Sequence, residues 1–126
     1  KQDYASAADL NNCFYNSSFV ASNTDKKVQD FVAAYQEEYQ SAPTNFCALG
    51  YDAAMIVCQA LAVVEKAGYT LGTLEYRKAT IEAIASNKVD GVTGAISYNG
   101  SGDPVKSTLI VAFQDGKEVI YDTIEG

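Results

Sequence analysis

The chain has 126 residues and a mass of 13.5 kDa, which is enough for one domain at most. Hydrophobic residues make up 48% and charged residues 20%, a globular composition rather than that of a disordered tail or a fibrous repeat. A net charge of -7 disfavours a nucleic-acid partner, because phosphates would be repelled. Gln59 interrupts the most apolar stretch, Ala53 to Val64, so we expect no membrane-spanning helix.

The sequence contains no histidine, which excludes catalytic triads and Cys-His pairs within the chain. Most zinc sites need histidine or paired cysteines, and Cys13, Cys47 and Cys58 show no C-x-x-C spacing. Cys47 and Cys58 fall on one predicted helix, about 16 Å apart along its axis and too far apart for a disulfide. We therefore expect small buried thiols, no metal, no cofactor and no enzymatic activity.

The first half of the chain predicts a strand followed by two helices. Residues 1–12 indicate a helix remnant or a loop, and the aromatic-rich stretch Cys13 to Ala21 favours a short strand. N-cap candidates at residues 22–25 precede an amphipathic helix that ends at Ser41-Ala42-Pro43. Its apolar stripe consists of Val28, Phe31, Val32, Tyr35 and Tyr39.

A second helix is predicted from about Phe46 to Ala67, with Gly68 as its C-cap. Its middle is apolar nearly all round, so we expect it to be buried on most faces. A third helix spans roughly Leu74 to Ser86. Its expected inward residues are Leu74, Ile81, Ile84 and Ala85.

After Asp90-Gly91 the pattern becomes strand-like. Short strands are predicted at Ala95 to Tyr98, Thr108 to Phe113 and Glu118 to Ile124, with a dense turn at residues 99–104 and a hairpin at Asp115-Gly116. The order of one strand, three helices and three strands predicts an α/β fold. No internal repeat or linker marks a second domain.

Few residue patterns indicate chemistry. Glu37-Glu38 lies opposite the apolar stripe and is interpreted as solvated surface. The loop at residues 99–103 lacks the spacing and distal glutamate of a calcium loop, and the glycines form no phosphate-binding loop. Aromatic residues remain: most are expected in the core, and a minority could line a pocket beside a helix N-terminus, where backbone N–H groups favour a carboxylate.

Three stretches occur in an order and spacing that resemble a known family. They are residues 27–35 (KVQDFVAAY), residues 48–54 (ALGYDAA) and residues 90–94 (DGVTG), the last followed by Gly102-Asp103-Pro104. Together they resemble the C-terminal third of the solute-binding proteins of branched-chain amino acid ABC transporters, of periplasmic-binding-protein type I. The resemblance covers essentially all 126 residues.

The resemblance implies a three-layer α/β lobe of which this chain is a C-terminal segment. Such proteins are about three times as long and bind an amino acid between two α/β lobes joined by three crossing strands. Residues 1–126 would mostly complete one lobe, with hinge-crossing strands near 13–21 and 107–113. The chain opens on Lys1 with no signal peptide, so we expect a processed chain or a piece of a longer one.

The resemblance also implies one wall of a ligand site. Phe46 would line the apolar side chain of the ligand, with Tyr51 and Ala48 as weaker candidates. The acidic residue that pairs with the ligand ammonium would fall before Lys1. The implied protein is the extracytoplasmic binding component of an ABC importer, in the periplasm or as a cell-surface lipoprotein. Its partners would be a small amino acid with a branched-chain or otherwise apolar side chain, a membrane permease and the missing upstream part of the same protein.

Two other functions are compatible with the sequence. One is the ligand-sensing ectodomain of a receptor with the same fold. The other is a small flavodoxin-like enzyme or phosphoacceptor domain, which would need a phosphate-binding loop or an acidic cluster that the sequence does not show. A lobe segment would also leave sheet edges and helix faces uncovered, so we expect self-association.

Overall fold

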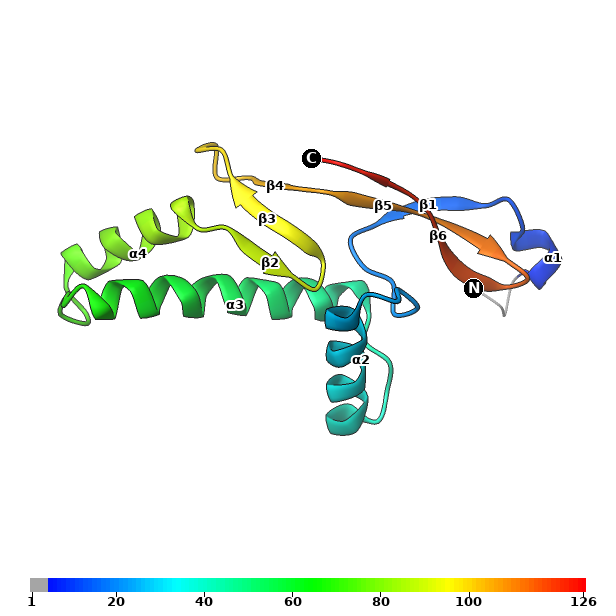
Figure 1. Ribbon diagram of the computed structural model, residues 1–126, viewed down its shortest axis with the longest axis horizontal. Helices are drawn as coiled ribbons and strands as arrows, with labels where there is room; N and C mark the ends of the chain where they lie inside the picture. Colours follow the sequence, from blue (N-terminus) through cyan, green and yellow to red (C-terminus); the bar gives the residue numbers. More distant parts are fainter. Residues whose placement is uncertain (1–4) are drawn as a thin grey trace.

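The structure is a computed structural model that describes residues 5–126. It consists of two parts that lie at opposite ends of an elongated molecule (Figure 1). The helical unit contains α2 (Lys26–Tyr39), α3 (Asn45–Lys66), α4 (Leu74–Ser86), β2 (Val89–Gly91), β3 (Gly94–Tyr98) and β4 (Pro104–Lys106). The sheet unit contains α1 (Ala7–Leu10), β1 (Phe14–Ser17), β5 (Thr108–Gln114) and β6 (Lys117–Ile124).

Each unit has a three-stranded antiparallel sheet. In the helical unit the strand order is β2-β3-β4, and in the sheet unit it is β1-β5-β6. Residues 18–25 connect β1 to α2, and Ser107 alone separates β4 from β5, so the chain passes between the units twice (Figure 1). The sheet unit is thus assembled from the two ends of the sequence.

Local sequence signals account for the helices. The side chains of Asp25, Thr44 and Thr73 each cap the helix that follows by accepting a hydrogen bond from a backbone N–H of its first turn. The predicted helix positions are confirmed to within one residue for α3 and α4. The predicted hairpin at Asp115-Gly116 is also confirmed: both residues have positive φ angles, 51° and 78°, as the tight turn between β5 and β6 requires.

The strands differ more from the prediction. The strand expected over Cys13 to Ala21 ends at Ser17, because Phe19 and Val20 leave the sheet and are buried, Phe19 in the core of the helical unit. The sequence did not predict β2 or β4, which have three residues each and carry too short a pattern to be recognised.

Two hydrophobic clusters form the core of the helical unit. The first joins Phe19 to α2, α3 and the turn between β2 and β3, through Val28, Val32, Ala48 and Val92. The second packs Ile56 of α3 against Val89 and Ile96 of the adjoining sheet. In the sheet unit the buried hydrophobic residues lie in β5, at Val111, Ala112 and Phe113.

The third helix is buried on a different face from the one expected. Leu74 and Ile81 are 59% and 67% exposed and Ala85 is exposed too, so the inward assignment of these three residues is wrong. Ile84 is partly buried against the second cluster, and Tyr76 is buried. Tyr76 approaches α3, where its hydroxyl lies 3.4 Å from a carboxyl oxygen of Glu65. Packing on α3 therefore selected an aromatic residue that the helical pattern did not single out.

The long helix α3 is also less covered than expected. Its buried residues form a single ridge with a spacing of four: Ala48, Asp52, Ile56, Ala60 and Val64. The expectation that it is buried on most faces is wrong. By length and composition alone, α3 could cross a membrane, contrary to our expectation from the interrupting Gln59. We interpret α3 as a core helix, because this ridge packs against α4 and β2 and includes a carboxyl group.

Candidate functional site

A buried carboxyl group fixes the turn between β2 and β3 to α3. Asp52 is 1% exposed, and its Oδ1 accepts a hydrogen bond of 2.8 Å from the Val92 backbone N–H. Its Oδ2 accepts hydrogen bonds from the backbone N–H and the hydroxyl of Thr93, at 2.8 and 2.6 Å. A buried carboxyl group needs such partners, since an unsatisfied one would be strongly unfavourable. We call this arrangement the Asp52 anchor.

Two further residues complete the Asp52 anchor. A side chain at Gly91 would overlap the Asp52 carboxyl group, so glycine permits the close approach of the turn. Lys106 of β4 donates a hydrogen bond of 2.6 Å to the Thr93 hydroxyl. Burial lowers the pKa of Lys106, and the nearby Asp52 opposes that shift. Asp52 and Gly91 belong to two of the motifs in the sequence, but their close approach could not be predicted, because Asp52 and the turn it binds are about 40 residues apart in sequence.

The first turn of α3 lies at the end of the helical unit that faces the sheet unit (Figure 1). Thr44 caps this turn, and its hydroxyl lies 3.2 Å from the Cys47 sulfur, which is also 3.2 Å from the Tyr35 hydroxyl. Hydrogen bonding to Thr44, and then to Tyr35, lowers the pKa of the Cys47 thiol. These contacts tie the start of α3 to α2. The expectation of small buried thiols is wrong, because Cys47 is only partly buried and Cys13 and Cys58 are exposed.

Phe46 is 82% exposed at this turn. A large aromatic side chain that is exposed on the first turn of a helix is a candidate for contact with a ligand or another polypeptide. Asn45, the preceding residue, has its side-chain oxygen 3.3 Å from the hydroxyl of Ser17 in β1. Phe46 therefore lies close to the boundary between the two units.

The other two predicted site residues lie elsewhere. Ala48 is 0% exposed in the first core cluster, two residues and about 200° around the helix from Phe46. Tyr51 is half-exposed and contacts Phe31 of α2 in a tilted arrangement, with ring centroids 5.0 Å apart. The structure does not bring Phe46, Ala48 and Tyr51 onto one surface.

Tyr51 instead lines an open groove of about 670 Å³ between α2 and α3. Phe31, Met55 and Val92 form its apolar part, and Lys27 and Asp30 lie at its polar side. Lys27 also forms an ion pair with Asp90 of β2. This groove is a second concave surface, separate from the first turn of α3.

A hollow of about 400 Å³ lies at the junction of the two units. It is lined by residues of β1, the connection after β1 and the loop before α3, among them Ser17, Phe19, Thr44 and Asn45. Tyr15 lies on its β1 side, and burial together with a hydrogen bond to Glu118 raises the pKa of its hydroxyl. This hollow adjoins the turn that carries Phe46, and it includes polar groups from both units.

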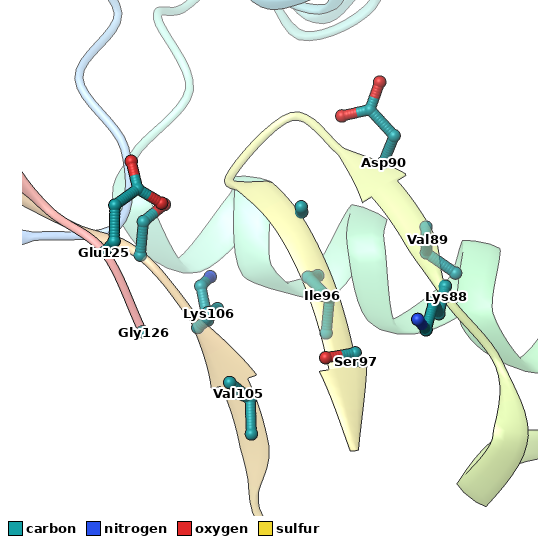
Figure 2. A pocket seen from close by; sticks show the side chains of 11 residues that line it. Lys88, Val89, Asp90, Ile96, Ser97, Val105, Lys106, Glu125 and Gly126 are labelled. Carbon is teal, nitrogen blue, oxygen red and sulfur yellow. The ribbon is translucent and has the colours of Figure 1, made fainter. Parts of the chain in front are cut away.

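A further pocket of about 340 Å³ lies against the β2–β3–β4 sheet, next to the C-terminal residues Glu125 and Gly126 (Figure 2). Its charged side chains have both signs, with Lys88 and Asp90 on β2 and the loop before it, and Lys106 on β4. None of the predicted site residues lines it. Among residues 5–126 there is also no group of three or more metal-binding side chains.

No family model matches the sequence, and no curated protein matches it either. Solved structures do match. One is the solute-binding protein of an ABC transporter from Rhodopseudomonas palustris in complex with benzoate, with a TM-score of 0.74 and 19% sequence identity. The match covers 90% of this chain and 30% of that protein. Another is the branched-chain amino acid transporter substrate-binding protein from Streptococcus pneumoniae in complex with isoleucine, with a TM-score of 0.72 and 23% sequence identity. The match covers 99% of this chain and 34% of that protein.

A third structure, an ABC transporter substrate-binding protein from Desulfitobacterium hafniense in complex with leucine, has a TM-score of 0.72 and 26% identity. It is matched over 90% of this chain and 32% of its own. The chain therefore has the fold of a lobe of type I periplasmic binding proteins, which confirms the predicted fold class, and it spans about a third of the length of these structures. The three proteins are transporter components that bind solutes.

Proposed function

We propose that this chain is part of the solute-binding component of an ABC importer. It contributes the apolar wall of a site for a small amino acid whose side chain is branched or otherwise apolar. The observation that carries the proposal is the position of Phe46, exposed at the junction of two units within a fold shared with solute-binding proteins over about nine tenths of the chain. Such a protein acts outside the cytoplasm, delivers its ligand to a membrane permease and catalyses no reaction.

The ligands named for the three solved structures favour an apolar wall. Leucine, isoleucine and benzoate each combine a carboxylate with an apolar group. A wall built around a phenylalanine ring suits the apolar group, since burying such a group contributes roughly 1.5–3 kcal/mol. The carboxylate and any ammonium need hydrogen-bonding partners of their own in a closed site.

The proposed site needs more polypeptide than this chain supplies. Phe46 is open to solvent, and the hollow beside it is open rather than enclosed. In the proposed arrangement, residues 1–126 mostly complete one lobe, and the connections near residues 13–21 and 107–113 cross the hinge between two lobes. Closure of the lobes around the ligand would then cover Phe46.

A thermal melt of the chain tests whether it binds ligand alone. We expect a cooperative transition whose midpoint does not move with millimolar leucine, isoleucine, valine, alanine, phenylalanine or benzoate. A ligand that binds the folded state must raise the midpoint. A shift specific to one compound would therefore contradict the proposal that this chain holds one wall of the site only.

A chimera tests the ligand class. This chain would replace the matched third of the Desulfitobacterium hafniense protein, and calorimetry would measure the binding of the same compounds after a cooperative melt shows that the chimera folds. We expect binding of a branched-chain amino acid, weakened about 10- to 100-fold by Phe46→Ala, because an apolar contact of 1.5–3 kcal/mol is lost. Tyr39→Ala, at another exposed aromatic residue, is the matched control. A folded chimera that binds none of the compounds, or binds equally well without Phe46, would refute the proposal.

A further inference from the structure

The two passages of the chain between the units lie next to each other. In the first, at residues 17–19, β1 ends and Phe19 enters the core of the helical unit. In the second, at residues 106–108, Ser107 alone separates β4 from β5. Ser17 and Leu109 are register partners of β1 and β5, so both passages leave the sheet unit at the same end. The angle between the units therefore depends on the contacts that hold these two passages.

The side chain of Lys106 joins the second passage to the helical unit. Its Nζ donates a hydrogen bond of 2.6 Å to the Thr93 hydroxyl, which in turn donates one of 2.6 Å to Oδ2 of the buried Asp52. Three polar side chains thus connect β4 to α3 through the turn between β2 and β3. Hydrogen bonds of charged groups are the stronger ones, and partial burial strengthens them further.

The backbone of Lys106 meets the segment that follows β6. Ile124 is the register partner of Thr108, and residues 125 and 126 continue beside Lys106 (Figure 2). A side chain at Gly126 would overlap the Lys106 carbonyl group, so the two backbones lie in close contact. Lys106 therefore contacts the extension of the sheet unit through its backbone and the helical unit through its side chain.

Longer polar contacts hold the first passage. The Thr108 hydroxyl donates a hydrogen bond of 3.3 Å to the carbonyl oxygen of Ser17, whose own hydroxyl lies 3.3 Å from the side-chain oxygen of Asn45, the first residue of α3. Ser17 is buried. These contacts and those of Lys106 form a closed series that begins and ends on α3. We call it the junction circuit: Asn45, Ser17, Thr108, Lys106, Thr93 and Asp52.

We propose that Lys106 is a positioning residue that fixes the angle between the two units and, with it, the place of Phe46 relative to the sheet unit. The junction circuit attaches the two passages to α3 at Asn45 and Asp52, about two turns apart. Rotation of α3 against the sheet unit therefore breaks a contact of the circuit. Phe46 follows Asn45 on the same helical turn. The part of the inference that concerns Phe46 rests on the proposed function, whereas the part that concerns the angle does not.

Distances between spin labels test this inference on the full chain. Cys13 and Cys58 are both exposed, and they lie in different units. The carbonyl oxygen of Cys13 accepts a hydrogen bond from the backbone N–H of Phe113 in β5, and Cys58 belongs to α3. Cys47→Ser removes the third thiol and places a hydroxyl there. Double electron–electron resonance then measures the distribution of distances between nitroxides on Cys13 and Cys58, for which we expect one narrow maximum.

Substitutions of two lysines show whether Lys106 sets this distribution. Lys106→Met removes the charged donor and keeps an apolar stem, so the distribution should broaden about twofold while the thermal melt stays cooperative. Lys106→Arg retains a charged donor and should keep the distribution narrow. Lys88→Met is the matched control, because Lys88 is an exposed lysine of the same pocket, and it should leave the width unchanged.

Thr108→Val tests the other half of the junction circuit, without relying on the folding of Lys106→Met. It should broaden the distribution less, because the hydrogen bond that it removes is longer. A broad distribution before any change to the circuit, equal widths in Lys106→Met and Lys88→Met, or a width in Lys106→Arg as large as in Lys106→Met would each overturn the inference. If Lys106→Met does not fold, an unchanged width in Thr108→Val overturns it. No ligand is present, so a chimera that binds no solute would refute the proposed function and leave this result standing.

Discussion

The two units of this chain are held together in different ways. In the helical unit two hydrophobic clusters join three helices to a small sheet, and the Asp52 anchor adds a buried polar connection between α3 and the turn that follows β2. In the sheet unit the buried hydrophobic residues lie in the central strand, and β6 is mostly exposed. The edge-to-face contact of Phe14 with Tyr121 lies on an exposed surface.

Different kinds of contact stabilise the two units. The helical unit has contacts that converge on buried residues from several elements, whereas the sheet unit depends on strand pairing around β5. We therefore expect the sheet unit to open more readily than the helical unit. This difference can be tested with substitutions that destabilise one unit, because hydrogen exchange at individual amides then shows which unit opens.

The largest effect is expected from Asp52→Ala. The substitution leaves the N–H groups of Val92 and Thr93 buried without an acceptor, which should lower the free energy of unfolding by about 3–4 kcal/mol. Urea denaturation measures the loss, and hydrogen exchange at residues 92 and 93 should accelerate. Asp103→Ala, at an exposed position, is the control and should change stability little. An equal increase in hydrogen exchange in β5 would show that the two units open together, which would contradict the expected difference in their stability.

A smaller effect is expected from Val111→Ala in the sheet unit. Val111 is 0% exposed, and the loss of two methyl groups should lower the free energy of unfolding by about 2 kcal/mol. Exchange should accelerate at amides of β1, β5 and β6 and stay unchanged in α3. The control is Ile120→Ala in β6, which is 39% exposed and should cost less. If Ile120→Ala costs as much as Val111→Ala, the sheet unit has another covered face.

The smallest effect is expected at the first turn of α3, where a substitution changes the pKa of a thiol and leaves the protein folded. Tyr35→Phe removes one of the two hydroxyl groups beside the Cys47 sulfur that lower the pKa of its thiol. The pKa of Cys47 should therefore rise, which moves the midpoint of its alkylation by iodoacetamide to higher pH. Mass spectrometry of the labelled peptide follows the reaction across pH.

Tyr39→Phe serves as the control for this last measurement. The ring of Tyr39 contacts that of Tyr35 in a tilted arrangement, with centroids 4.5 Å apart, but the Tyr39 hydroxyl does not contribute to the lowered pKa of Cys47. The alkylation midpoint should stay in place in this variant. A midpoint that does not move in Tyr35→Phe, or moves to lower pH, would show that Tyr35 does not stabilise the thiolate.

Much of the fold could be predicted from local sequence signals. The caps at Asp25 and Thr73 and the turn at Asp115-Gly116 act over a few residues, so their effects can be recognised without the tertiary structure. The strands β2 and β4 were missed because three residues hold no measurable alternation, and their pairing with β3 is what makes them strands.

The candidate site was predictable only in part. Exposure of Phe46 agrees with a role at a surface, but Ala48 on the same turn is buried because α3 places it against α2 and Phe19. The Asp52 anchor was missed because neither Asp52 nor Gly91 has an unusual local pattern, and their meaning lies in a contact between distant segments.

The sequence by itself determined where the helices begin and end, the apolar character of α3 and the absence of any imidazole for catalysis, because each follows from residue type and short-range spacing. Tertiary structure decided which side of α3 is buried, how Asp52 is satisfied and which residues of α4 face inward. These outcomes depend on which apolar surface each helix meets, and α3 offers apolar residues on both sides. The packing of α4 and β2 selects the side of α3 that carries Ala48, Asp52, Ile56, Ala60 and Val64.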